Sequence, residues 1–298
     1  MGVFKKKTTL VHHITYMGIM TAINLIFIVL SYYFQFLIFL LILVLPFISA
    51  IVSYYCLKRY YPVYAIASIG LCLIFNIPDT IFNLVPAIIT GFVIGVLLEK
   101  KINPFWLILS STIIESALTL AFIPLVNLIG GVEDIVGYAF QLLKLENFVY
   151  KTEVIFLFIF FISLVQSTLT HFVLLSDAKK IGIEVNTTVS SYGPYIVGAE
   201  ISILMSLSFG FFYLPLALVF FMISICFSMF LIIDLLLSKK AIVYVLLGIL
   251  FLIAFFVFAL LYTKINRPLG LLILVIFPFV ITLMSFINNY LLKSTTNN

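Results

Sequence analysis

Charged side chains are scarce in this 298-residue chain: Asp, Glu, Lys and Arg together make up 9% of the residues, whereas 64% are hydrophobic. About a quarter of the residues in a soluble domain are normally charged. Because a water-soluble exterior needs polar groups to cover it, this scarcity excludes an ordinary soluble domain. Long apolar runs such as Phe36–Leu57 and Ala241–Thr263 are suited to a bilayer instead. The sequence therefore predicts a polytopic integral membrane protein.

Cysteines and catalytic motifs are also few. The three cysteines, Cys56, Cys72 and Cys226, lie in or at the edges of apolar segments without C-x-x-C spacing. This placement argues against a disulfide framework and against a zinc site. The chain has no GxxxxGK[ST], HExxH, GxSxG or Asp-rich pyrophosphate motif. We therefore predict no enzyme activity, no metal and no cofactor.

The basic residues occur in short clusters rather than in one continuous patch, although the net charge is +5. This distribution argues against nucleic-acid binding, which needs an extended basic surface. It is typical of topology signals and of contacts with anionic lipids. Twelve of the sixteen Lys and Arg residues belong to these clusters, which are Lys5–Lys7, Lys58-Arg59, Lys100-Lys101, Lys179-Lys180, Lys239-Lys240 and Lys293.

The clusters predict the orientation of the chain in the membrane. A cytoplasmic N-terminus places all six on the inner side and leaves only Lys144, Lys151, Lys264 and Arg267 outside. The inverted orientation would break the positive-inside rule at nearly every loop. We therefore expect a multi-pass protein of the plasma membrane with both termini in the cytoplasm and an even number of spans.

The expected fold class is an all-α transmembrane helix bundle of about eight to ten spans, at about twenty apolar residues per span. Pro62–Phe75 is short for a span, and only the Phe212-Tyr213 region separates the seventh segment from the eighth. The ten apolar segments are Ile14–Tyr32, Phe36–Leu57, Pro62–Phe75, Ile81–Leu98, Pro104–Leu128, Val154–Ser176, Pro194–Phe211, Leu214–Leu237, Ala241–Tyr262 and Leu269–Leu292.

Two connections divide the chain. Residues 132–150 combine apolar residues at helical spacing with polar ones, which indicates a helix in the outer interface, serving either as a tether or as a lid. Residues 177–193 are polar and end at a Gly-Pro pair, which indicates a cytoplasmic connector. We predict a six-span block over residues 1–176 and a four-span block over residues 194–298.

Three acidic residues lie in or near the predicted spans: Glu115, Glu200 and Asp234. A carboxylate in hydrocarbon costs a few kcal/mol even on lenient scales, so it must face a partner, water or a cavity. Glu115 is the strongest candidate because its depth leaves no route for snorkelling, whereas Asp234 lies close to the basic cluster at 239–240.

Hydroxylated residues accompany Glu115, among them Ser111 and Thr119. Such a face either lines a polar cavity or hydrogen-bonds to neighbouring helices. With Asn24, whose amide also needs a partner in lipid, these residues are the candidate substrate contacts. His12, His13 and His171 have no second ligand at metal-binding spacing.

Small residues recur at four-residue spacing in two spans. Gly91 and Gly95 form a GxxxG motif, which favours close packing between helices. Gly18 and Ala22 share one face of the first span, which suits either internal packing or docking of a partner protein.

The first block contains, in this order, Thr15–Ala22 (TYMGIMTA), Ile77–Asp79, Leu84–Gly95 and Glu99–Lys101. With these segments it resembles the substrate-binding S components of energy-coupling factor (ECF) transporters. Those proteins have six spans and an Ala-xxx-Ala motif in the first helix that docks on the coupling subunit. Gly18-xxx-Ala22 occupies the corresponding place here.

Two later segments are residues 178–185 (AKKIGIEV) and 231–240 (LIIDLLLSKK). With them the whole chain resembles the YybS-like group of uncharacterised Gram-positive membrane proteins, which are similar to S components but carry extra C-terminal spans. The C-terminal end lacks that group's acidic and Arg-containing pattern. The resemblance implies a protein that captures a small substrate from outside and depends on a coupling subunit with its ATPases. A non-transporting membrane scaffold or regulator, and a self-contained secondary transporter, are the alternatives.

Overall fold

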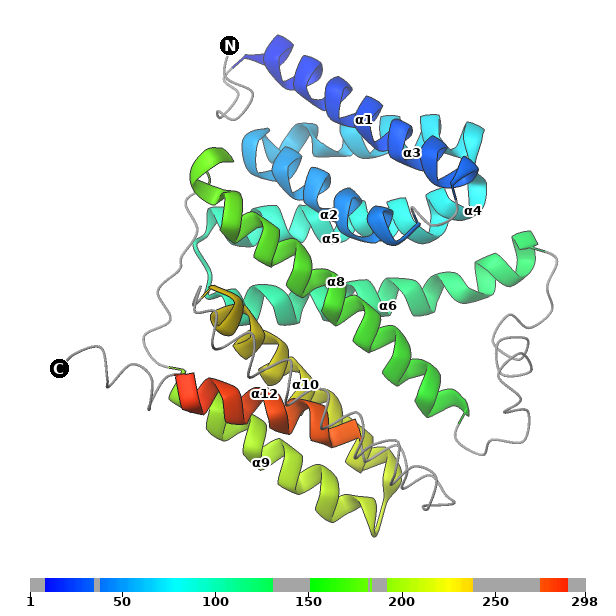
Figure 1. The fold of residues 1–298 in the computed structure, drawn as a ribbon. Coiled ribbons are helices and arrows are strands. Elements are labelled where there is room, and N and C mark those ends of the chain that lie inside the picture. The colour runs from blue at the N-terminus through cyan, green and yellow to red at the C-terminus, as the bar shows by residue number, and fades with distance from the viewer. Residues whose placement is uncertain are drawn as a thin grey trace. The chain divides into compact units, whose positions relative to one another are not determined.

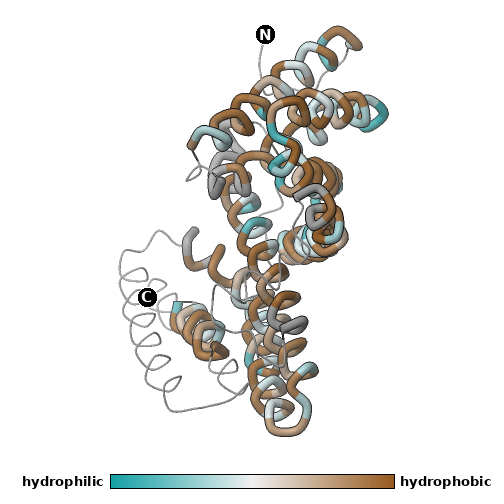
Figure 2. Tube along the Cα trace, turned by 90° about the vertical axis from the view of Figure 1, so that its right-hand side faces the viewer, coloured by the Kyte–Doolittle hydropathy of each residue, from teal (hydrophilic) through white to brown (hydrophobic). Residues whose placement is uncertain are grey.

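The structure is a computed structural model that describes residues 9–34, 38–130, 151–181, 183, 192–237 and 274–288. All regular structure in these ranges is helical, which confirms the predicted all-α class. Six of the described helical segments are long and apolar enough to cross a membrane. Hydrophobic residues predominate along them (Figure 2). The chain is therefore a multi-pass membrane protein.

The chain forms two compact units that share the long helix α8 (Lys151–Ile181). The first unit comprises residues 1–147 and 165–187, and the second comprises residues 148–164 and 188–298. Residues 148–164 thus group with the C-terminal part of the chain, and the two blocks of spans over residues 1–176 and 194–298 stay a prediction. Each unit is described separately below.

The helices of the first unit follow the predicted apolar segments closely. Its fourth predicted span is a continuous helical stretch from residue 77 to residue 99 that changes type twice. Figure 1 labels these helices, whose bounds are α1 (Leu10–Tyr33), α2 (Ile38–Tyr55), η2 (Lys58–Tyr60), α3 (Tyr61–Phe75), α4 (Ile77–Asp79), the π-helical turn η3 (Thr80–Leu84), α5 (Val85–Glu99) and α6 (Pro104–Gly130).

Local sequence signals explain several of these helix ends. Thr9 caps α1 by accepting a hydrogen bond from the backbone N–H of His12 at 3.4 Å. Pro62 and Pro86 occupy the first turns of α3 and α5. Backbone N–H groups in a first turn have no acceptor within the helix, so a proline there removes no helical hydrogen bond. Lys101 ends α5 with a left-handed backbone, at φ 54°.

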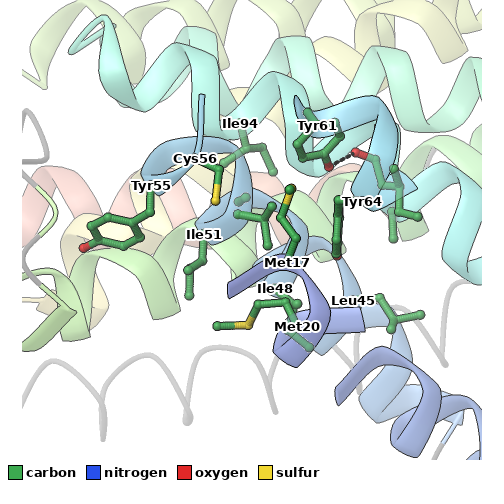
Figure 3. Packing of buried hydrophobic residues seen from close by; sticks show 14 of the residues in the cluster. Met17, Met20, Leu45, Ile48, Ile51, Tyr55, Cys56, Tyr61, Tyr64 and Ile94 are labelled. Carbon is green, nitrogen blue, oxygen red and sulfur yellow. Dashed lines mark hydrogen bonds between the residues drawn. The ribbon is translucent and has the colours of Figure 1, made fainter. Parts of the chain in front are cut away.

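The core of the first unit is built mainly from α1, α2, α3 and α5. Figure 3 shows side chains from all four helices converging, among them Met17, Leu45, Tyr64 and Ile94. Each of these four side chains is no more than 4% exposed. In lipid, contacts of this kind stabilise the bundle through van der Waals packing rather than through removal of apolar surface from water.

Three contacts show which helix ends lie together in the first unit. Lys58 and Glu99 form an ion pair at 2.8 Å, and the rings of His13 and Tyr60 lie 5.2 Å apart. The start of α1, the end of α2 and the end of α5 therefore share one end of the unit. Ser31, near the end of α1, donates to Asp79 of α4, which marks the other end. This alternation is what successive membrane crossings require.

The second unit contains α9 (Gly193–Gly210), α10 (Leu214–Leu237) and α12 (Ile276–Phe286), together with the first part of α8. The helices α9, α10 and α12 lie side by side (Figure 1), and a small apolar core joins them. Its members are Ile196, Leu231, Leu235, Ile281 and Met284.

Several sequence predictions differ from the structure or lie outside it. The predicted sixth span ended at Ser176. In the structure, α8 includes the polar Asp-Ala-Lys-Lys segment that follows and ends at Ile181. The predicted connector of residues 177–193 is therefore helical in its first part. The outer segment of residues 132–150 and the ninth span, Ala241–Tyr262, lie outside the described residues. The count of ten spans stays a prediction.

Candidate functional site

Glu115 lies deep inside the first unit, on α6. It follows Pro104 by eleven residues, or about 16 Å along the helix axis, which is roughly half the thickness of the hydrocarbon core. Its side chain is 5% exposed. Among the charged residues whose side-chain burial the structure describes, no other Asp, Glu, Lys or Arg is buried to this degree. Within that set, Glu115 is the one deeply buried acid.

Two polar side chains from neighbouring helices face the Glu115 carboxyl: Thr90 of α5 and Gln166 of α8. The Thr90 hydroxyl is fully buried but makes no hydrogen bond of good geometry with a described residue. The Oε2 atom of Glu115 is likewise without a hydrogen-bond partner among the described residues. We call Thr90, Glu115 and Gln166 the Glu115 site. Its polar atoms have spare hydrogen-bonding capacity in a setting where an unsatisfied group costs several kcal/mol.

The hydroxyl groups near Glu115 on α6 are mostly bonded to their own helix. Ser111 donates to the carbonyls of Leu107 at 2.8 Å and Ile108 at 2.9 Å, and Thr112 donates to Ile108 at 2.8 Å. Ser110 and Ser116 bond in the same way. Back-bonding of this kind lets a helix carry hydroxyls in lipid without partners elsewhere. The described bonds of these hydroxyls run along α6 itself, and the polar cavity and the contact with neighbouring helices stay predictions.

Helical spacing places Ser111, Glu115 and Thr119 on one face of α6, because they lie four residues apart. Ser111 is fully buried and Thr119 is half-buried. Since the Ser111 hydroxyl has its proton committed to the helix, Glu115 is the better placed of the two to meet a ligand. The role of Thr119 in substrate binding stays a prediction.

The segment of α8 around Gln166 is polar and buried. Ser167, Thr168, Thr170 and His171 are each at most 5% exposed. Their hydroxyl oxygens, and both ring nitrogens of His171, are without hydrogen-bond partners among the described residues. His171 follows Gln166 by five residues, or about 7.5 Å along the axis. Buried polar atoms without described hydrogen-bond partners thus continue along α8 beyond the Glu115 site.

Asn24, the other candidate substrate contact, belongs to a different polar cluster. Its Nδ2 donates to the Tyr64 hydroxyl at 2.7 Å, and that hydroxyl also pairs with Ser49 at 3.1 Å. Thr21 and Ser68 pair beside them at 2.9 Å. These bonds link α1, α2 and α3, and no described contact joins Asn24 to Glu115. The arrangement fits a structural role for Asn24, although its Oδ1 is without a described partner.

The two small-residue motifs have opposite surroundings. A Cβ atom added at Gly91 would overlap the Cβ of Ser49, and one at Gly95 would lie 2.5 Å from the Cβ of Ser53. Gly91 and Gly95 thus let α5 approach α2 closely. A Cβ at Gly18 would meet nothing within 4 Å, and Ala22 is also exposed. Gly18 and Ala22 therefore lie on a face of α1 that no described residue covers.

One polar constellation was not singled out from the sequence. The Asp79 carboxylate accepts hydrogen bonds from Ser31 at 3.1 Å, Asn76 at 2.7 Å and Asn83 at 3.2 Å. It stands directly before the π-helical turn η3, a helix type that often marks functional positions. With three donors, this carboxylate is well satisfied. The Asn-x-x-Asp-x-x-x-Asn spacing was the sequence signal that could have revealed the cluster.

Within the residues that the structure describes, no group of three or more His, Cys, Asp or Glu side chains is placed to hold a metal ion. No protein-family model, curated protein or solved structure matches the chain. The resemblance to S components and to the YybS-like group therefore stays a prediction from the sequence, and the functional argument depends on the site itself.

Proposed function

We propose that this protein is a solute-binding membrane protein of the ECF S-component type, which holds a small substrate at the Glu115 site. The observation that supports this proposal is the unpaired Oε2 of Glu115, buried between α5 and α8 with the Thr90 hydroxyl beside it. Leaving such groups unsatisfied in lipid is costly. A polar ligand that bonds to them recovers this free energy and so binds selectively.

Energy for transport would come from other subunits. The sequence has no nucleotide-binding motif, so this chain needs a coupling subunit and separate ATPases to drive a cycle with ATP. The face of α1 at Gly18 and Ala22, which no described residue covers, is the proposed docking surface for that coupling subunit. Its small residues permit a close helix approach, in which van der Waals contact supplies the energy.

Ligand binding is tested by thermal stability. We expect one compound in a panel of vitamins, nucleobases and inorganic cations to raise the melting temperature of the purified protein. A ligand present at 100 times its Kd stabilises the folded state by about 2.7 kcal/mol. Glu115→Gln and Thr90→Val should each greatly reduce the shift caused by that compound, because they remove groups that face it.

Matched controls separate binding from stability. Ser111→Ala should keep the ligand shift, because the Ser111 hydroxyl bonds its own helix. Glu99→Gln should keep it as well, because Glu99 pairs with Lys58 at the end of the unit. The binding proposal fails if no compound in the panel stabilises the wild type, or if Glu115→Gln retains the full shift.

Docking is tested by co-purification. Gly18→Leu should abolish recovery of an ECF coupling subunit with its ATPases in mild detergent, because leucine prevents the close approach. Gly70→Leu is the matched control, since a side chain at that position of α3 also meets nothing within 4 Å. Recovery of the coupling subunit with the Gly18→Leu protein at wild-type levels would refute the docking proposal.

A second function, self-contained secondary transport, is favoured by the isolation of Glu115, since a single buried acid can carry a proton or a sodium ion across the membrane. It predicts uptake by the purified protein alone in proteoliposomes with an ion gradient. Glu115→Gln should uncouple that uptake from the gradient. Uptake that needs no partner yet is unaffected by this substitution would count against this role for Glu115.

A further inference from the structure

A groove of about 360 Å³ runs between α9 and α12 in the second unit and shares no residue with the Glu115 site. Its volume falls within the range of about 300–1,000 Å³ that is usual for ligand pockets. Aliphatic side chains line most of it, among them Val197, Ile201 and Leu204 of α9, and Phe286 lies at the end of α12. These four side chains are 45–62% exposed, so the groove is open on one side.

The polar exception in this groove is Glu200. Its Oε1 accepts a hydrogen bond from the Thr282 hydroxyl of α12 at 2.8 Å, which holds the carboxyl group at the groove wall. No Lys, Arg or His among the described residues forms an ion pair with it. Glu200 follows Gly193 by seven residues, or about 10 Å along a helix that can cross the membrane. Its negative charge is therefore uncompensated by described side chains within an apolar setting.

The chemistry of the groove selects among ligand classes. An anion would be repelled by Glu200, and a neutral apolar molecule would leave the carboxylate without a counter-charge. A divalent metal ion needs several oxygen ligands, whereas the groove offers one carboxylate and no described acidic neighbour. A molecule with one positive charge on an apolar body can place its charge on the Glu200 carboxylate and its apolar body against the aliphatic lining.

We propose that this groove binds an amphiphilic organic monocation, with its ammonium group on the Glu200 carboxylate and its apolar body against Val197, Leu204 and Phe286. The ammonium supplies a positive charge that no described residue of the groove supplies, and its N–H groups donate to the carboxylate oxygens as charge-assisted hydrogen bonds. This site is independent of the proposed substrate site, because its residues all belong to the second unit.

A pair of matched probes tests the assignment: 1-adamantylammonium and 1-adamantanol have the same apolar cage, and only the first carries a charge. Binding is measured by calorimetry on the protein in phosphatidylcholine nanodiscs, with empty nanodiscs correcting for partition into lipid. The ammonium should bind the wild type at least tenfold more tightly than the alcohol. Glu200→Gln should remove that preference, since its amide oxygen can still accept from Thr282 but its charge is gone.

Two further variants keep the test decisive. Leu204→Trp should weaken both probes by filling the groove while leaving Glu200 in place, and Glu99→Gln should change neither, because Glu99 lies in the other unit. The proposal is overturned if the wild type does not bind the ammonium, if it binds both probes equally, or if Glu200→Gln keeps the tenfold preference. Because Glu115 takes no part, loss of the substrate site would leave these outcomes unchanged.

Discussion

Replacement of Gly91 by alanine is expected to destabilise the first unit by about 1–3 kcal/mol, the usual cost of over-packing a closely packed core. The added Cβ would overlap Ser49 and lie 2.8 Å from the carbonyl oxygen of Pro46 and 2.9 Å from the backbone nitrogen of Ala50. Backbone atoms cannot rotate away as a side chain can, so α2 and α5 must move apart. The measurement is thermal unfolding of the purified protein in a mild detergent.

Gly70→Ala is the matched control for Gly91→Ala. A Cβ at Gly70 meets nothing within 4 Å, and alanine is the better helix former by about 0.5–1 kcal/mol. Gly70→Ala should therefore leave the melting temperature unchanged or raise it. Equal melting temperatures for the two variants would show that α2 and α5 are not packed as closely as described.

Removal of the Tyr64 hydroxyl is expected to cost about 1–3 kcal/mol, the penalty for leaving a buried polar partner unsatisfied. Tyr64→Phe would deprive the Asn24 amide of its acceptor and the Ser49 hydroxyl of its partner. Tyr64, Asn24 and Ser49 are all fully buried, so water cannot replace the lost bonds. Tyr213→Phe, at a residue that is 61% exposed, should change the melting temperature little.

A double-mutant cycle tests the same contact directly. Once Asn24 is replaced by leucine, no amide remains to be left unpaired, so Tyr64→Phe should cost less in that background. A coupling of about 0.5 kcal/mol or more between the two positions is expected for residues in one hydrogen-bonded cluster. Strictly additive effects would indicate that the Asn24–Tyr64 bond contributes nothing to stability.

Together, these contacts assign different roles to the two polar regions of the first unit. In the Asn24 cluster the Asn24 amide nitrogen is bonded to the Tyr64 hydroxyl, and the bonds of the cluster link α1, α2 and α3, while the Asn24 Oδ1 is without a described partner. The Glu115 site has polar atoms left over. Both regions have an acceptor without a described partner, but the one at Glu115 is a carboxylate oxygen, whereas Asn24 is already bonded into the contacts that link three helices. This difference makes Glu115 the better candidate for substrate contact.

Helix existence was predictable because each span must be a long apolar run. The predicted Pro104–Leu128 and Leu214–Leu237 segments differ from α6 and α10 by at most two residues at either end. Helix ends were predictable where a capping residue or a proline marks them, and less so where a polar stretch stays helical, as in α8 beyond Ser176. Amphipathic patterning did not help to find buried faces, because lipid and core are both apolar.

The sequence by itself determined that the chain is an all-helical membrane protein and that Glu115 has an exceptional position, since charge in hydrocarbon is rare for energetic reasons. Only the tertiary structure decided which polar groups meet. It placed Thr90 and Gln166 at Glu115, paired Asn24 with Tyr64, and set Glu200 in a groove beside Thr282. Spacing along one helix shows which residues share a face, but the neighbour of that face depends on how the helices pack. The spans have similar apolar surfaces, so the sequence pattern does not show which helix packs against which.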